Sequence, residues 1–121
     1  MRRDMDVVRS IVLAVSDASG PVNSVDGVSD EDFSSHAQLM EEAGLIEAAL
    51  LPQGKRVATN AVIFRLTWNG HEFADSVRDS KVWAKTKEAA TASGGFTVDL
   101  LKDLAKGFIK KQIEDLTGVK L

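Results

Sequence analysis

The fold of this chain is decided by residues 34–47, which read SSHAQLMEEAGLIE. Together with Phe33, these residues place four apolar side chains at helical spacing on one side of a predicted helix: Phe33, Ala37, Leu39 and Met40. Gly44 then ends the periodic pattern, as glycine commonly does at the carboxyl end of a helix. The stretch therefore predicts a helix that closes at Gly44 and leads directly into a strand.

The flanking residues predict how this helix begins and which elements come after it. Ser29 and the acidic run Asp30–Asp32 are typical of an N-cap and a first helical turn. Strands are predicted at 45–51 and 61–68, the second with residues 62, 64, 66 and 68 on one face, and a wing-like loop lies around 52–56. A helix and then such a hairpin is the order of the third helix and wing of a winged-helix domain.

Further helices are predicted at 4–18, 67–79, 81 to about 92, and 98–116. Ser80 and Thr97 are the expected caps of the last two, the segment 93–95 (Ser-Gly-Gly) should separate them, and Gly118 should end the chain's final helix. We expect one α+β domain over residues 1–121. Residues 1–79 would form a winged-helix-like core with a two-stranded wing, and residues 80–121 a helical extension.

Composition narrows the possible classes of function. The chain has 121 residues, a formal net charge of -3 and no cysteine, which excludes disulfides and thiolate chemistry. No apolar run is long enough for a membrane span. His36 and His71 stand far apart without neighbouring ligands, so we expect no metal site, no cofactor and no catalytic constellation. These features predict a soluble, cytoplasmic protein.

Three motifs together resemble a known family. RRDMD at residues 2–6, LMEEAGLI at 39–46 and RLTWNGHEF at 65–73 are similar to segments of small bacterial and phage proteins grouped as domain of unknown function 2513. The sequence VWAKTK at 82–87 also fits. The resemblance covers most of the chain and implies a winged-helix-like fold and a bacterial or mobile-element origin, without any catalytic residue. The chain departs from the family pattern at Ser35 and Gln38, where an aromatic residue and a lysine are usual.

Charge is distributed unevenly around the predicted third helix. Between Arg9 and Lys55 there is no lysine or arginine, whereas there are eight aspartates and glutamates. The plain interpretation is a solvated helix face with acids that suit the helix dipole. The functional one, which we prefer, is a non-enzymatic protein that binds a protein partner through this acidic face. The candidate contact residues are Asp30, Glu31, Asp32, Ser35, His36 and Glu42.

The alternative hypothesis is a regulator-like DNA-binding protein. It would need a scaffold helix before the recognition helix, and phosphate contacts from basic side chains. Only residues 19–28 are available for the scaffold helix, and their Gly20, Pro21 and Gly27 allow at most one turn. The candidate nucleic-acid contacts are Arg2, Arg3, Ser34, Gln38, Lys55 and Arg56. An enzyme of unrecognised type is a third and weaker hypothesis.

Three further features remain, and two of them, the tryptophans and the last helix, have both a structural and a functional interpretation. Trp68 and Trp83 are expected in the core, or else one of them is exposed and marks a contact surface. His71 is expected to cap or pack a helix. The last helix, with its apolar stripe of Leu101, Leu104, Phe108, Ile109 and Ile113, should pack on the core or mediate a homodimer.

Overall fold

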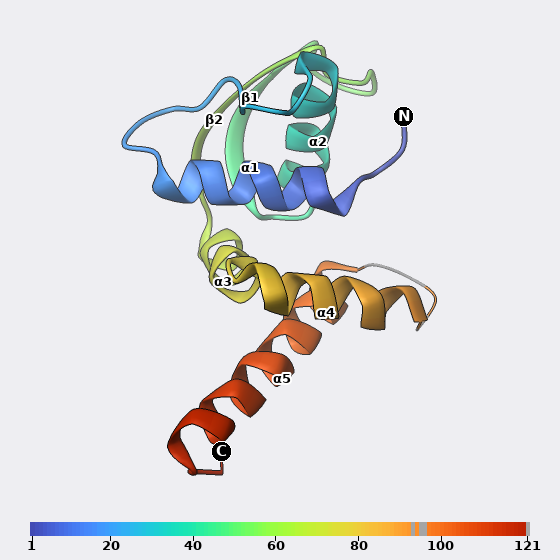
Figure 1. Ribbon diagram of the computed structural model, residues 1–121. Helices are drawn as coiled ribbons and strands as arrows, with labels where there is room; N and C mark the ends of the chain where they lie inside the picture. Colours follow the sequence, from blue (N-terminus) through green and yellow to red (C-terminus); the bar gives the residue numbers. More distant parts are fainter. Residues whose placement is uncertain (93, 95–96, 121) are drawn as a thin grey trace. The chain divides into compact units, whose positions relative to one another are not determined.

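The computed structural model describes residues 1–92, 94 and 97–120 (Figure 1). In this part of the chain it contains five helices and a two-stranded antiparallel sheet. The elements are α1 (Met5–Asp17), α2 (Asp30–Glu42), β1 (Ile46–Leu51), β2 (Asn60–Leu66), α3 (Trp68–Val77), α4 (Ser80–Ala92) and α5 (Val98–Thr117). The predicted α+β class is confirmed, and each predicted helix and strand is present with small shifts at its ends.

The chain divides into two compact units, Met1–Ala74 and Asp75–Leu121. The first unit carries 6 lysines and arginines against 11 aspartates and glutamates, a formal charge of -5. The second carries 9 basic against 7 acidic residues, a formal charge of +2. The acidic character of the protein therefore belongs to the first unit.

The core of the first unit lies between α1, α2 and the hairpin, which all contact one another (Figure 1). One side of α1 is buried along its whole length, through Met5, Val8, Ile11, Val12 and Val15. From α2 the apolar residues Phe33, Ala37 and Met40 are buried, as their spacing predicts. Burial of these faces is what holds two short helices in place.

The hairpin is registered from Ile46↔Leu66 to Leu51↔Asn60 and contains a bulge between Glu47 and Ala48. Because the bulge adds one residue to β2, Phe64 and Arg65 are both exposed, while Leu66 is buried like Ile63. The predicted strict alternation along residues 61–68 therefore holds as far as Phe64 and is wrong at Arg65 and Leu66, which exchange faces. The strand also ends at Leu66 rather than at Trp68.

A single bridge holds the segment between α1 and α2 against the hairpin. Val22 and Ile63 each donate a backbone hydrogen bond to the other, at 2.9 and 2.8 Å. The chain then makes one turn, in which the Val28 N–H donates to the Val25 carbonyl at 3.1 Å. No helix forms between α1 and α2, which agrees with the prediction made from Gly20, Pro21 and Gly27.

In the second unit α4 and α5 pack against each other. The Oδ1 atom of Asp79 accepts from the N–H groups of Lys81 and Val82, both at 2.9 Å, so Asp79 and not the predicted Ser80 caps α4. Thr97 caps α5 as predicted, accepting from the Leu100 N–H at 3.0 Å. Gly118 ends α5 in the left-handed conformation, with φ 72°.

The apolar stripe of α5 is buried only in its first half. Leu101 and Ala105 are buried, whereas Ile113 is 41% exposed and Leu116 is 80% exposed. Of the predicted breaker between α4 and α5, Gly94 lies in a turn, and Ser93 and Gly95 fall outside the described residues. Whether the exposed half of α5 mediates a homodimer stays a prediction.

Candidate interaction surface on helix α2

Helix α2 begins with a cap and three acids. The Ser29 hydroxyl accepts from the Asp32 N–H at 3.1 Å, which is the N-cap bond that the sequence predicts. The side chains of Asp30, Glu31 and Asp32 are exposed in the first turn, where the helix dipole favours negative charge. These acids therefore stabilise the helix and at the same time make its amino end strongly negative.

Ser34 and Ser35 do not belong to the surface, because both are buried, with 1% and 3% exposure. The Ser34 hydroxyl donates to the Asp30 carbonyl at 3.0 Å, and the Ser35 hydroxyl donates to the Asp32 carbonyl at 3.3 Å. Serine satisfies its hydroxyl within its own helix in this way whenever no other partner is at hand. The sequence placed both residues among candidate contacts, and the structure places them inside.

His36 is fully buried and joins α2 to the start of α1. The Asp4 N–H donates to Nε2 of His36 at 2.9 Å, so this nitrogen must be unprotonated. The proton of the neutral ring is then on Nδ1, which donates to the Asp32 carbonyl at 2.8 Å. His36 was a candidate contact by sequence, but its two ring nitrogens are used inside the fold.

Gln38 binds the loop that connects β1 and β2. Its Nε2 donates to the Arg56 carbonyl at 2.9 Å, and its Oε1 accepts from the Ala58 N–H at 2.8 Å. Both ends of the amide are therefore occupied by the loop backbone. A candidate for reading base edges turns out to be the side chain that holds the loop against α2.

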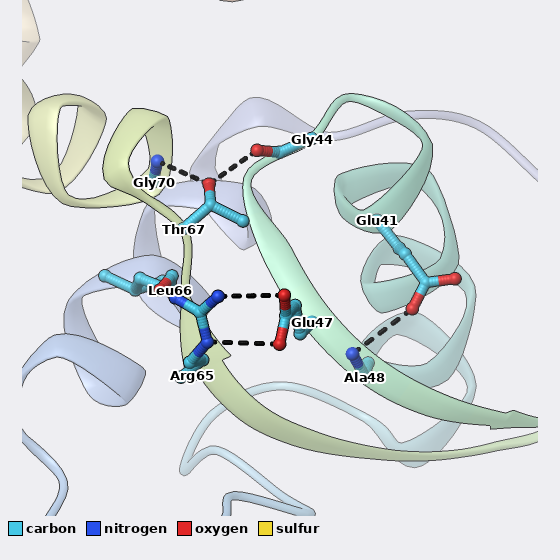
Figure 2. A network of polar contacts seen from close by, with 8 residues as sticks. All are labelled: Glu41, Gly44, Glu47, Ala48, Arg65, Leu66, Thr67 and Gly70. Atoms are coloured by element: carbon cyan, nitrogen blue, oxygen red, sulfur yellow. Dashed lines mark hydrogen bonds and ion pairs between the residues drawn. The ribbon is translucent and has the colours of Figure 1, made fainter.

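Two further acids are engaged by the hairpin (Figure 2). Glu41 accepts from the Ala48 N–H at 3.2 Å, next to the bulge. Glu47 forms a two-bond ion pair with Arg65, at 2.8 and 3.1 Å, across the outer face of the hairpin. Because both partners of this pair are 58% exposed, it contributes at most about 1 kcal/mol.

The side chains of α2 that stay exposed and unused by the fold are acidic: Asp30, Glu31, Asp32 and Glu42. We call these four residues the acidic face. The basic candidates Arg2, Arg3, Lys55 and Arg56 are also exposed. Arg2 and Arg3 directly precede the segment that His36 binds. Lys55 and Arg56 lie in the loop that Gln38 binds. Two small basic clusters therefore stand next to α2 without lying on it.

The motif RLTWNGHEF connects the start of α3 to the turn between α2 and β1 (Figure 2). The sequence did not indicate this connection. The Thr67 hydroxyl donates to the Gly44 carbonyl at 2.5 Å and accepts from the Gly70 N–H at 3.1 Å. The Thr67 N–H donates to the Leu45 carbonyl at 2.9 Å. At Gly70 an added Cβ would lie 2.0 Å from the Leu45 oxygen, so only glycine fits. A threonine three residues before a glycine at a helix start is the sequence signal that could have indicated this contact.

The aromatic and histidine candidates of the later chain differ in burial. Trp83 is buried, with 4% exposure, as expected for a core residue. Trp68 is 79% exposed, and its Nε1 donates to Glu72 at 2.7 Å. His71 is exposed as well, so the packing role expected for its side chain is wrong.

A hollow of about 590 Å³ lies at the amino end of α2, between this helix, the hairpin and the segment after Val22. It is lined by Asn23, Ser24, Asp30, Phe33, Ser34, Ala49, Leu51, Thr59, Asn60, Ala61 and Val62. Asp30 is the only charged residue of this lining. No sequence motif pointed to the hollow, because it forms where a strand edge and a helix end meet.

Within the described residues, no group of three or more histidine, aspartate or glutamate side chains is placed to hold a metal ion. None of the helices in the same part of the chain combines the length and apolar character needed to cross a membrane.

The structure thus defines a small α+β protein with a helix and hairpin unit that exposes acidic side chains at both ends of helix α2. The chain belongs to the family described as hypothetical protein (DUF2513), whose model matches residues 2–97. It is similar to an uncharacterized protein of Haemophilus influenzae, with 31% identity over 119 residues that cover 93% of this chain and 99% of that protein. No solved structure gives a significant match.

Proposed function

We propose that the first unit is a winged-helix-like domain from a bacterium or its phage, in which α2 has the place of the third helix and the hairpin that of the wing. The order of α1, the Val22 bridge, α2 and the hairpin supports this assignment. The single turn at 25–28 would stand where a full scaffold helix normally lies. The relative from Haemophilus influenzae supports a bacterial origin.

We propose that the protein acts without catalysis, by binding a basic protein partner through the acidic face. One observation carries this proposal: once the internal hydrogen bonds of α2 are assigned, its four free side chains, Asp30, Glu31, Asp32 and Glu42, are all carboxylates. No lysine or arginine between Arg9 and Lys55 offsets them. A surface of one charge sign attracts partners of the opposite sign and repels nucleic acid.

The proposal is tested by charge reversal. The variant with Asp30→Lys, Glu31→Lys and Asp32→Lys should lose a partner that co-purifies with the native protein from its host. The matched control is Glu88→Lys with Asp103→Lys and Asp115→Lys, which reverses the same number of exposed acids in the second unit and should retain the partner. Circular dichroism verifies that both variants are folded. Equal recovery of the partner with the reversed and the native protein would refute the proposal.

The alternative function is DNA binding through Arg2, Arg3, Lys55 and Arg56. The observation that favours it is that His36 and Gln38 hold these two clusters next to α2. Phosphate contacts by four basic residues would give binding that weakens steeply as salt rises. Retention on duplex DNA at low salt that is lost in Lys55→Ala with Arg56→Ala would support this function. Absence of retention at low salt would exclude it.

A further inference from the structure

The free edge of β2 carries an unused pair of backbone groups. In an antiparallel strand the N–H and C=O groups of one residue point to the same side, and successive residues alternate sides. Ile63 exchanges both of its bonds with Val22, so its groups face away from β1. The backbone N–H and C=O of Val62 then point to β1, where Val62 pairs with Ala49. The backbone groups of Ala61 point to the same free edge as those of Ile63.

Nothing in the described residues continues the ladder at this edge. The Val22↔Ile63 bridge is isolated, and the chain leaves the edge at Asn23 and Ser24 to form the turn before α2. The 590 Å³ hollow borders this edge, because Ser24 and Ala61 both line it, and its lining continues over the hairpin to Ala49 and Leu51 of β1. The N–H and C=O of Ala61 therefore face the side of β2 that borders this hollow.

We propose that this hollow receives an extended segment of a basic partner protein, which adds as a strand beside β2 and pairs its backbone with Ala61. The inference rests on the proposed function and deepens it, because it states how the partner of the acidic face is held. The backbone would supply affinity, and alternate side chains would enter the hollow, as in other cases of strand addition.

The lining of the hollow indicates which side chains the segment carries. Its apolar part includes Phe33, Val62 and the 59% exposed side chain of Leu51, which would contact aliphatic groups. Asp30 provides the only charge of the lining and is also part of the acidic face. A lysine or arginine of the segment would meet this carboxylate. A segment that alternates basic and aliphatic residues matches both features.

The test uses the full ¹⁵N-labelled chain and a peptide of about six residues, the usual length of a strand, with alternating lysine and valine. The readout is hydrogen exchange of individual backbone amides. On peptide addition the Ala61 amide should exchange at least about tenfold more slowly, because it gains a hydrogen-bond partner. The Val62 amide already faces β1 and should change little.

Three matched changes sharpen the result. The peptide with an N-methylated backbone loses the N–H groups that would donate to the Ala61 carbonyl and should bind about tenfold more weakly. A peptide with glutamate in place of lysine should bind more weakly at low salt. Asp30→Asn should reduce the preference for lysine over glutamate, while Asp26→Asn, which changes an exposed acid outside the hollow, should leave it unchanged.

Each outcome decides the inference separately from the proposed function. Slower Ala61 exchange together with the N-methyl effect supports strand addition. Absence of peptide binding overturns it. Binding that perturbs Glu31 and Glu42 but leaves Ala61 exchange unchanged also overturns it, while the acidic face keeps its proposed role. If the charge-reversed variant retains the partner but the peptide slows Ala61 exchange, the proposed function is overturned and the strand site stands.

Discussion

Replacing Gly70 by alanine is the most direct test of the connection between the start of α3 and the turn between α2 and β1. The Cβ of the new side chain would lie 2.0 Å from the Leu45 carbonyl oxygen, whereas such contacts essentially never fall below 3.0 Å. One of the two backbones must therefore move by about 1 Å. The movement would strain the bond from the Thr67 N–H to the Leu45 carbonyl and the bond from the Thr67 hydroxyl to Gly44.

The size of the effect is the sum of three contributions. Overpacking costs roughly 1–3 kcal/mol, and loss of two hydrogen bonds costs about 1 kcal/mol each. Alanine is favoured over glycine in a helix by about 1 kcal/mol, which offsets part of the loss. We expect Gly70→Ala to lower the free energy of unfolding of the first unit by about 3 kcal/mol. For a unit of this size the change corresponds to a Tm lower by about 15 °C.

The assay is thermal unfolding monitored by circular dichroism, with amide exchange at Ile63 to report on the first unit alone. The matched control is Gly107→Ala in α5, where an added Cβ has nothing within 4 Å and should change Tm only slightly and upward. A Tm of Gly70→Ala within about 2 °C of the native value would show that the close approach to Leu45 does not constrain this helix.

Three further substitutions separate structural from surface roles. His36→Ala should lower the free energy of unfolding by about 3 kcal/mol in urea titrations, because it removes two part-buried hydrogen bonds and leaves a cavity where the buried ring stood. A loss under about 1 kcal/mol would contradict the role of His36. Gln38→Ala should lower the free energy of unfolding by about 1–2 kcal/mol and speed hydrogen exchange of the Ala58 amide. Unchanged exchange at Ala58 would refute the loop contact. Arg65→Ala should change the free energy of unfolding by less than about 1 kcal/mol, since the pair with Glu47 is exposed; a larger loss in the same titration would show that the pair is structural.

The sequence predicted the elements of this fold well, because their signals are local. Helical spacing in α1 and α2, the Ser29 and Thr97 caps and the Gly118 end each depend on a few neighbouring residues. The bulge was missed because it depends on how β1 and β2 pair, not on either strand alone. The same reason explains why Leu66 was placed on the face of Val62 and Phe64, although it is buried with Ala61 and Ile63.

The candidate contact residues were predicted less well. Acids at the start of a helix are exposed almost by necessity, so Asp30, Glu31 and Asp32 lie where the sequence placed them. Ser35 and His36 have polar side chains whose partners are distant or internal backbone groups, and no sequence pattern reveals such partners. Polarity alone could not distinguish a residue that faces solvent from one that holds the fold together.

The anchoring of α2 has a consequence for the entropy of binding. Side chains of this helix reach three separate backbone segments, through His36 to Asp4, Gln38 to the loop after β1, and Glu41 to Ala48. The helix therefore cannot turn about its axis without breaking all three connections. A partner that meets its outer side binds a rigid surface and loses little free energy in ordering it. Calorimetry of such a complex should accordingly show a heat-capacity change that matches the apolar area buried at the contact alone.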